Sequence, residues 1–143
     1  MRLTKLDKEL IEMATKVAKD NSDRYTDLSM HTGCVVRAGS GTIYRGVNIK
    51  TSHSICAEQV AIGQALASGE RAFDTIVAVK LNKDGSARVV SPCGVCRYLL
   101  DKLEVEMSVI VEDVKTGKVL KVKASELLPY PYKREINYIN KKK

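Results

Sequence analysis

The sequence of 143 residues contains no tryptophan, only one phenylalanine and no long apolar run. No window reaches the roughly 20 consecutive apolar residues that a membrane-spanning helix needs. The N-terminal residues become amphipathic at once, without the apolar core of a signal peptide. We therefore expect a soluble, cytoplasmic protein that does not act at a membrane.

Cysteine is scarce as well, with four residues at positions 34, 56, 93 and 96. This number is too low for a disulfide-stabilised scaffold, and a chain of this length can bury a sizeable core without one. The cysteines are therefore expected to act as thiols, and any metal that they bind is free to do chemistry.

The net charge of +7 raises the question of a nucleic-acid partner, but the charge is unevenly placed. Residues 133–143 contain five basic residues and one acidic residue, so this stretch carries more than half of the net positive charge. With one phenylalanine and no tryptophan, the body of the chain is poor in the aromatic stacking platforms that single-strand binders use. We expect one domain over residues 1–132 followed by a solvated basic tail over 133–143, and no nucleic-acid partner.

Hydrophobic periodicity predicts an alternation of helices and strands. Helices are expected over 4–19, 56–67, 92–103 and 124–128, and strands over 32–38, 42–47, 73–81, 87–90, 107–111 and 119–122. The helix over 56–67 is apolar nearly all round, which predicts its burial, and Pro92 is expected at the first position of the next helix. This order predicts a single-domain three-layer α/β/α fold with a mixed sheet.

Two short motifs carry most of the chemical information: Cys-Ala-Glu at 56–58 and Pro-Cys-Gly-Val-Cys-Arg at 92–97. Each motif begins a predicted helix after a strand-to-helix turn, where sites assemble in α/β sheets. Three thiolates are a strong ligand set for zinc and leave a fourth position for water. A carboxylate beside that position can accept and return protons.

Together the motifs match the zinc deaminase signature of His or Cys, one residue, Glu, and then Pro-Cys-two residues-Cys. With Gly-Val-Asn at 46–48 and Glu-Leu-Leu-Pro at 126–129, the chain resembles the cytidine deaminase superfamily, and within it the blasticidin S deaminases and small cytidine deaminases. The resemblance implies a five-stranded mixed sheet flanked by helices. It also implies a homotetramer whose active sites draw on neighbouring subunits.

The resemblance implies roles for individual residues. Cys56, Cys93 and Cys96 are the expected zinc ligands, and Glu58 is the expected catalytic proton shuttle. A Cys at position 56 instead of His is typical of members that act on free nucleosides. The resemblance also implies three substrate contacts: the Asn48 side chain with the sugar 3′-hydroxyl, the Ala57 backbone N–H with the pyrimidine O2, and the Ser91 carbonyl with the leaving amine.

Among the positions that depart from the family pattern, two change the charge expected at the site. Lys50 stands where cytidine deaminases typically have a Glu that accepts a hydrogen bond from the sugar, and an ammonium group can only donate. We expect Lys50 to contact substrate and to favour analogues that carry a carboxylate, such as blasticidin S. Gln59 stands where many members have Arg, so Arg97 is expected to supply positive charge beside the thiolates.

The sequence thus predicts zinc-dependent hydrolytic deamination of the 4-amino group of a free cytosine nucleoside, cytidine or deoxycytidine. Deamination of blasticidin S or another analogue is the alternative, followed by a polynucleotide deaminase or a zinc-containing nucleic-acid-binding module. Two other interpretations of the cysteines compete with a catalytic zinc. One is a structural zinc whose fourth ligand comes from His31, Cys34 or His53. The other is a redox pair formed by Cys93 and Cys96.

Overall fold

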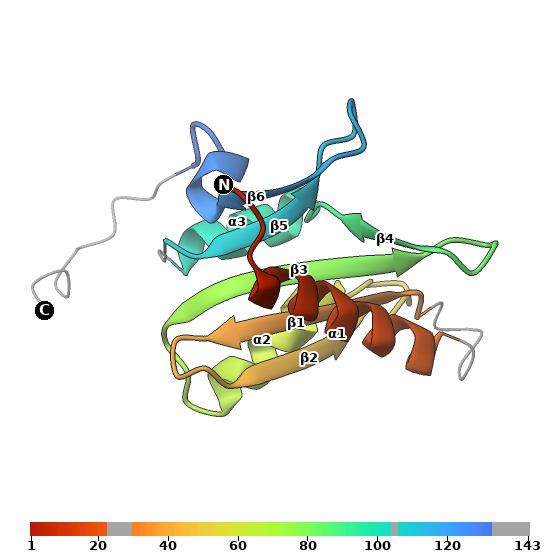
Figure 1. Cartoon of the computed structure of the whole chain (residues 1–143). Helices are drawn as coiled ribbons and strands as arrows, with labels where there is room; N and C mark the ends of the chain where they lie inside the picture. The colour runs from red at the N-terminus through yellow and green to blue at the C-terminus, as the bar shows by residue number, and fades with distance from the viewer. Residues whose placement is uncertain (23–29, 104–105, 133–143) are drawn as a thin grey trace, which may run out of the picture.

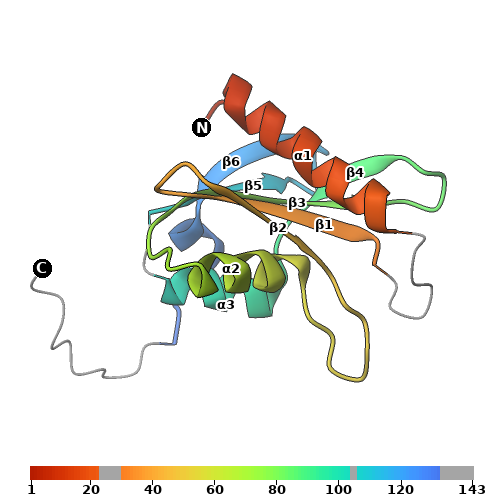
Figure 2. The ribbon, with the colours of Figure 1, turned by 90° about the horizontal axis from the view of Figure 1, so that it is seen from below.

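The computed structural model describes residues 1–22, 30–103 and 106–132. A mixed sheet lies between helix α1 on one face and helices α2 and α3 on the other (Figure 1, Figure 2). The elements in chain order are α1 (Lys5–Asn21), β1 (Thr32–Ala38), β2 (Ile43–Val47), α2 (Ala57–Ala67), β3 (Phe73–Leu81), β4 (Ala87–Val90), α3 (Gly94–Lys102), β5 (Ser108–Glu112), β6 (Val119–Lys123) and the 3₁₀ helix η2 (Ala124–Leu127). None of the helices in these ranges combines the length and the apolar character needed to cross a membrane.

The sheet has the strand order β2-β1-β3-β5-β6, with β3 and β5 parallel and the other neighbours antiparallel. This arrangement confirms the three-layer α/β/α fold with a mixed sheet. The expected number of five strands is wrong, because the described sheet contains a sixth strand, β4, which pairs with the end of β3. A tight turn over 82–86 folds the chain back and makes this pairing possible.

Each face of the sheet carries its own hydrophobic core. Cys34 and Val36 of β1 pack towards α2 and α3, whereas Val35 between them packs towards α1. Successive side chains of a strand point to opposite faces, so a central strand covered on both sides must be apolar at every position. This explains the nearly unbroken apolar sequence of β1 and β3.

Two glycines allow the helices to approach the sheet closely. A Cβ atom on Gly46 of β2 would lie 2.3 Å from the Ala57 carbonyl oxygen and 2.5 Å from the Ala61 nitrogen of α2. On the other face, a Cβ atom on Gly33 would lie 2.5 Å from the Ala14 carbonyl oxygen of α1. The absence of a side chain at Gly46 therefore allows the first turn of α2, which carries the first motif, to pack closely against β2.

The helices of the two motifs begin later than expected. Cys56 and Cys93 are N-cap residues with extended backbone, at ψ 150° and ψ 173°. Placing Pro92 at the first position of α3 was therefore wrong, since it precedes the cap. The expectation that α2 is buried all round was also wrong: Gly63, Gln64 and Ala67 are exposed because α2 is an outer layer that covers the sheet with one side only.

Candidate active site

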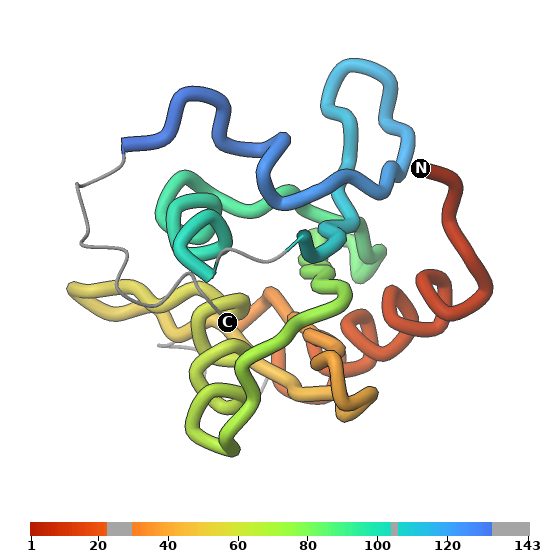
Figure 3. Tube along the Cα trace, turned by 90° about the vertical axis from the view of Figure 1, so that its left-hand side faces the viewer, coloured from red at the N-terminus to blue at the C-terminus, as the bar shows by residue number. Residues whose placement is uncertain are grey.

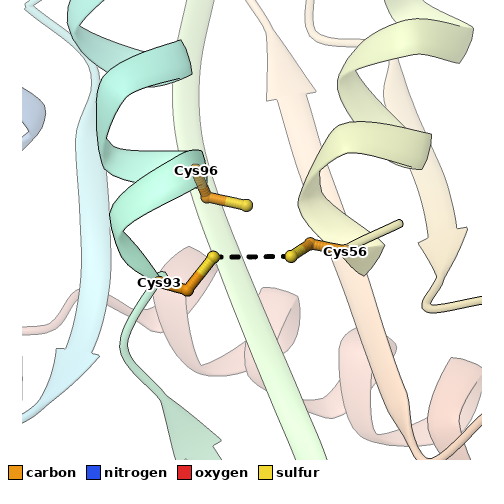
Figure 4. Close-up of side chains that lie close together, drawn as sticks. All are labelled: Cys56, Cys93 and Cys96. Atoms are coloured by element: carbon orange, nitrogen blue, oxygen red, sulfur yellow. Dashed lines mark hydrogen bonds between the residues drawn. The ribbon is translucent and has the colours of Figure 1, made fainter. Parts of the chain in front are cut away.

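The N-terminal ends of α2 and α3 bring three thiols together. Cys56 precedes α2, Cys93 precedes α3, and Cys96 lies in the first turn of α3, so that the sulfur atoms point towards one another (Figure 4). The Sγ atoms of Cys56 and Cys93 are 3.5 Å apart, and all three sulfur atoms lie within 4.8 Å of one another. The N-cap conformation directs each first thiol off the end of its helix.

The thiol cluster fits zinc by its donor set and its spacing. Tetrahedral zinc with Zn–S bonds of about 2.3 Å places its sulfur ligands about 3.8 Å apart. Burial raises the pKa of the Cys56 and Cys96 thiols, and the charge of Glu58 raises both further. Three thiolates can therefore form together here only when a bound cation offsets the cost of burying their charge.

The two competing interpretations of the cysteines find no support in the part of the chain that the structure describes. No fourth His, Cys, Asp or Glu joins the cluster within the described ranges. Cys34 is fully buried in the core, as expected of a small hydrophobic residue, and His31 and His53 are exposed. Cys93 also lies close to Cys56 of another helix, and this third thiol is left unexplained by a redox pair.

A cavity of about 290 Å³ opens beside the cluster. It is lined by the thiol-bearing Cys56 and Cys93, by Glu58, by all four residues expected to bind substrate, Asn48, Lys50, Ala57 and Ser91, and by Thr32, Ser54 and Ile55. The structure thus brings together residues from β1, from the segment 48–58 and from the segment before α3. Cys96 and Arg97 are not among the residues that line the cavity.

Sequence reasoning missed Thr32, Ser54 and Ile55. Thr32 lies opposite Asn48, and the two residues exchange hydrogen bonds: the Thr32 N–H donates to Asn48 Oδ1 at 3.0 Å, and the Asn48 N–H donates to the Thr32 carbonyl at 3.2 Å. This pairing of residues 16 apart in sequence follows from the β1–β2 hairpin. The two adjacent strands expected over 32–38 and 42–47 were therefore the signal that could have identified Thr32.

Glu58 is the buried carboxylate of the site, with 7% of its surface exposed. Burial raises the pKa of Glu58, although hydrogen bonds with its own backbone N–H and with Cys96 oppose this shift. A buried carboxyl group with a raised pKa, next to a cavity and a metal-binding cluster, has the character of a group that exchanges protons.

Neighbouring side chains hold the cluster in place. The Cys56 N–H donates to Gln59 Oε1 at 3.1 Å, which fixes the N-cap conformation of Cys56. Arg97 donates from Nε to the Pro92 carbonyl at 2.8 Å and from a terminal nitrogen to the Leu127 carbonyl at 3.4 Å. The contribution of positive charge from Arg97 to the thiolates stays a prediction.

Residues 4–112 match the cytidine and deoxycytidylate deaminase zinc-binding region. The chain belongs to the cytidine and deoxycytidylate deaminase family. The matched region contains all three thiols of the cluster, and zinc is accordingly the cofactor of this deaminase.

Similar proteins cover most of the deaminase chain. The blasticidin-S deaminase of Bacillus cereus is 37% identical over 139 residues, which cover 92% of this chain and 96% of that protein. The cytidine deaminase of Halalkalibacterium halodurans is 30% identical over 107 residues, which cover 72% and 77%. The crystal structure of the cytidine deaminase from Burkholderia pseudomallei superimposes with a TM-score of 0.70 at 26% identity, covering 91% of this chain and 100% of that one.

Proposed function

We propose that this deaminase hydrolyses the 4-amino group of a free cytosine nucleoside to the uracil form and releases ammonia. One observation carries the proposal: the three-thiol cluster and the buried Glu58 meet at a single cavity of about 290 Å³. This volume is close to the lower end of the range of small-molecule sites, about 300 to 1,000 Å³. It suits a ligand of nucleoside size.

The reaction exchanges one bond at C4 of the pyrimidine. The oxygen of a water molecule forms a bond to C4 and the C4–N bond breaks, while the two protons of the water end on ring N3 and on the departing ammonia. Zinc held by Cys56, Cys93 and Cys96 would supply a Lewis acid that makes this water more acidic.

The side chains of this chain would move the protons and hold the ring. Glu58 would accept the first proton from the attacking water and pass it to N3, which makes C4 more electrophilic, and it would then transfer the second proton to the leaving amine. The Ala57 N–H would donate to the pyrimidine O2, the Ser91 carbonyl would accept from the amine, and Asn48 would bind the sugar. The common position of these groups along one cavity supports these roles.

Blasticidin S is the second candidate substrate. It is favoured by the blasticidin-S deaminase of Bacillus cereus, whose similarity covers nearly the whole of both chains. It is also favoured by Lys50 in the lining of the cavity, because a cation suits a substrate with a carboxylate. Both candidates require the same chemistry at C4.

We further propose that the enzyme is a cytoplasmic homotetramer. Large apolar side chains are exposed, with 62% of Val95 and 43% of Tyr98 in α3 and all of Tyr130 accessible, and a subunit interface would cover such a surface. A cluster of three thiols needs a reducing compartment to stay in the thiol form. Size-exclusion chromatography with light scattering would report a mass of four chains, and a monomer would contradict the assembly.

A substrate panel tests the activity. The zinc-loaded protein is incubated with cytidine, deoxycytidine, blasticidin S and a cytosine-containing oligonucleotide, and the change in ultraviolet absorbance that accompanies deamination is followed. We expect turnover of at least one of the three small substrates and none of the oligonucleotide. Turnover of the oligonucleotide alone would replace the proposal by its polynucleotide alternative.

A further inference from the structure

The segment 48–56, the yellow loop in Figure 3, contains one antiparallel bridge and contributes to the lining of the cavity. Ile49 and Ile55 exchange both backbone hydrogen bonds, each 2.9 Å long. Asn48 and Lys50 flank Ile49 in the chain, and Ser54 and Cys56 flank Ile55. All four of these residues line the cavity.

The antiparallel bridge between Ile49 and Ile55 gives the cavity a direction. Because the two segments run in opposite directions, Asn48 lies on the same side of the bridge as Cys56 of the thiol cluster, and Lys50 lies on the same side as Ser54. Two residues of extended chain span about 6.6 Å, so the backbone of Lys50 lies about that much farther from the thiol end than the backbone of Asn48. A group on the substrate that reaches Lys50 must therefore lie beyond the part of the sugar that Asn48 contacts.

Charges in the lining are separated along the same direction. Glu58 is the buried carboxylate at the thiol end, and Lys50 is an exposed cation. Over residues 1–22, 30–103 and 106–132, the Lys50 ammonium group has no ion pair with a carboxylate. The lining around it offers a hydroxyl group, on Ser54, and no second carboxylate. The outer end of the cavity is thus rich in hydrogen-bond donors and carries positive charge.

We propose that Lys50 and Ser54 form a subsite for an anionic substituent on the sugar side of the substrate. The subsite rests on the proposed function, because the cytosine ring is assumed to lie against Glu58 and the thiol cluster. A carboxylate and a phosphate are both acceptors of charge-assisted hydrogen bonds from an ammonium group. The shared chemistry is an anion located beyond the hydroxyl that Asn48 binds.

The test compares matched substrates that differ only at the 5′ position of the sugar. Cytidine, cytidine 5′-monophosphate and cytidine whose 5′ carbon is a carboxylate are given to the zinc-loaded enzyme and to its Lys50→Met, Lys50→Glu and Lys50→Arg variants. The measured quantity is the ratio of kcat/KM for each anionic substrate to kcat/KM for cytidine. Lys115→Met is the control, since Lys115 is an exposed lysine in the β5–β6 turn, outside the cavity.

We expect Lys50→Met to lower the ratio about tenfold for at least one anionic substrate, Lys50→Glu to lower it further, and Lys50→Arg to retain most of it. The Lys115→Met variant should keep both constants of the wild type. A drop for the carboxylate alone, or for the phosphate alone, supports the subsite and identifies its anion. Ratios unchanged within about twofold for both anions in Lys50→Met and Lys50→Glu would overturn it.

A binding measurement separates this proposal from the proposed function. The affinity of the two anionic ligands for the zinc-loaded Glu58→Gln protein, with and without Lys50→Met, is measured by calorimetry. If cytosine nucleosides are not turned over but anion binding depends on Lys50, the proposed function fails and the subsite stands. If cytidine is turned over but Lys50→Met leaves the affinity for the anionic ligands unchanged, only the proposed subsite is wrong.

Discussion

Glu58 is the residue on which the proposed proton transfers depend. We expect Glu58→Gln to keep the fold and the bound zinc, because the amide has nearly the same shape and is not part of the thiol cluster. The rate should fall at least about a hundredfold, the lower end of the contribution of a general acid or base. Zinc content and steady-state kinetics check both halves of the prediction. Near-normal turnover in a zinc-loaded variant would assign the proton transfers to another group.

Single residues were predictable where they form part of a short motif. The cysteines at 56, 93 and 96 and Glu58 could be selected from the sequence because their spacing and residue types are specific for one kind of site. Thr32 carries no motif of its own, and it could have been selected only by pairing the two strands expected over 32–38 and 42–47, which places it opposite Asn48. The orientation of Arg97 towards two carbonyl groups likewise depends on tertiary contacts with Leu127.

Among the helices and strands, the packing of α2 against the sheet positions two residues of the first motif, Cys56 and Glu58. We expect Gly46→Ala to lower the free energy of unfolding by about 1 to 3 kcal/mol, the usual cost of overpacking, because its methyl group would overlap the backbone of α2. Displacement of α2 would also move Cys56 and Glu58, so activity should fall in the protein that remains folded. Thermal unfolding and kinetics of the purified variant measure these effects.

Gly63→Ala is the matched control for this change. Gly63 lies in the same helix, and a Cβ atom there would meet nothing within 4 Å. Since alanine is the better helix former by about 1 kcal/mol, the control should be at least as stable as the wild type. Equal stability of the two alanine variants would show that the packing of Gly46 against α2 does not limit the structure.

A second link between elements ties α1 to the far edge of the sheet. Asp7 of α1 is 1% exposed, accepts the Thr4 N–H at 2.7 Å and pairs with Lys121 of β6 at 2.9 Å. Burial alone would raise the pKa of Asp7, but these partners hold it below its ordinary value of 3.8. A carboxylate with a lowered pKa stabilises the fold above its unfolded pKa, and this contribution is lost as pH falls through the folded pKa.

We therefore expect Asp7→Asn to lower the free energy of unfolding by about 1 to 3 kcal/mol at neutral pH, the cost of leaving a buried charged partner unpaired. The difference from the wild type should shrink as the pH falls below 3.8. Asp20→Asn is the control, because Asp20 forms an exposed pair with Lys16 that contributes little. Urea unfolding at several pH values measures the difference, and a difference that grows on acidification would contradict the role given to Asp7.

The boundaries of elements were less predictable than their existence. Periodicity identified the four helical segments and the six strands, but the starts of α2 and α3 depend on the N-cap conformation of Cys56 and Cys93. Proline is favourable at a first helical position, and this preference misplaced the start of α3. The sequence did not predict that Cys56 and Cys93 are N-cap residues, whose thiols are directed off the ends of α2 and α3.

For the whole molecule, the sequence predicted the three layers because helix and strand patterns alternate, and it predicted the strand over 87–90 that pairs with β3, whereas the strand count implied by the family resemblance was one too low. The basic stretch over 133–143 lies outside the described residues, and its solvated character stays a prediction. We expect a chain truncated after residue 132 to keep its zinc, its assembly and its activity. Metal analysis, light scattering and kinetics test this expectation, and loss of assembly would place the stretch in a subunit interface.

In the proposed reaction, the zinc-dependent enzyme replaces the 4-amino group of a cytosine nucleoside with an oxygen atom from water. The most direct measurement is mass spectrometry of the nucleoside product formed in water enriched in oxygen-18, together with the amount of ammonia released, before and after removal of zinc. We expect one heavy oxygen atom in each product molecule, one ammonia for each, and loss of both on removal of the metal. A product without the heavy atom, or undiminished turnover in the metal-free protein, would contradict the proposed reaction.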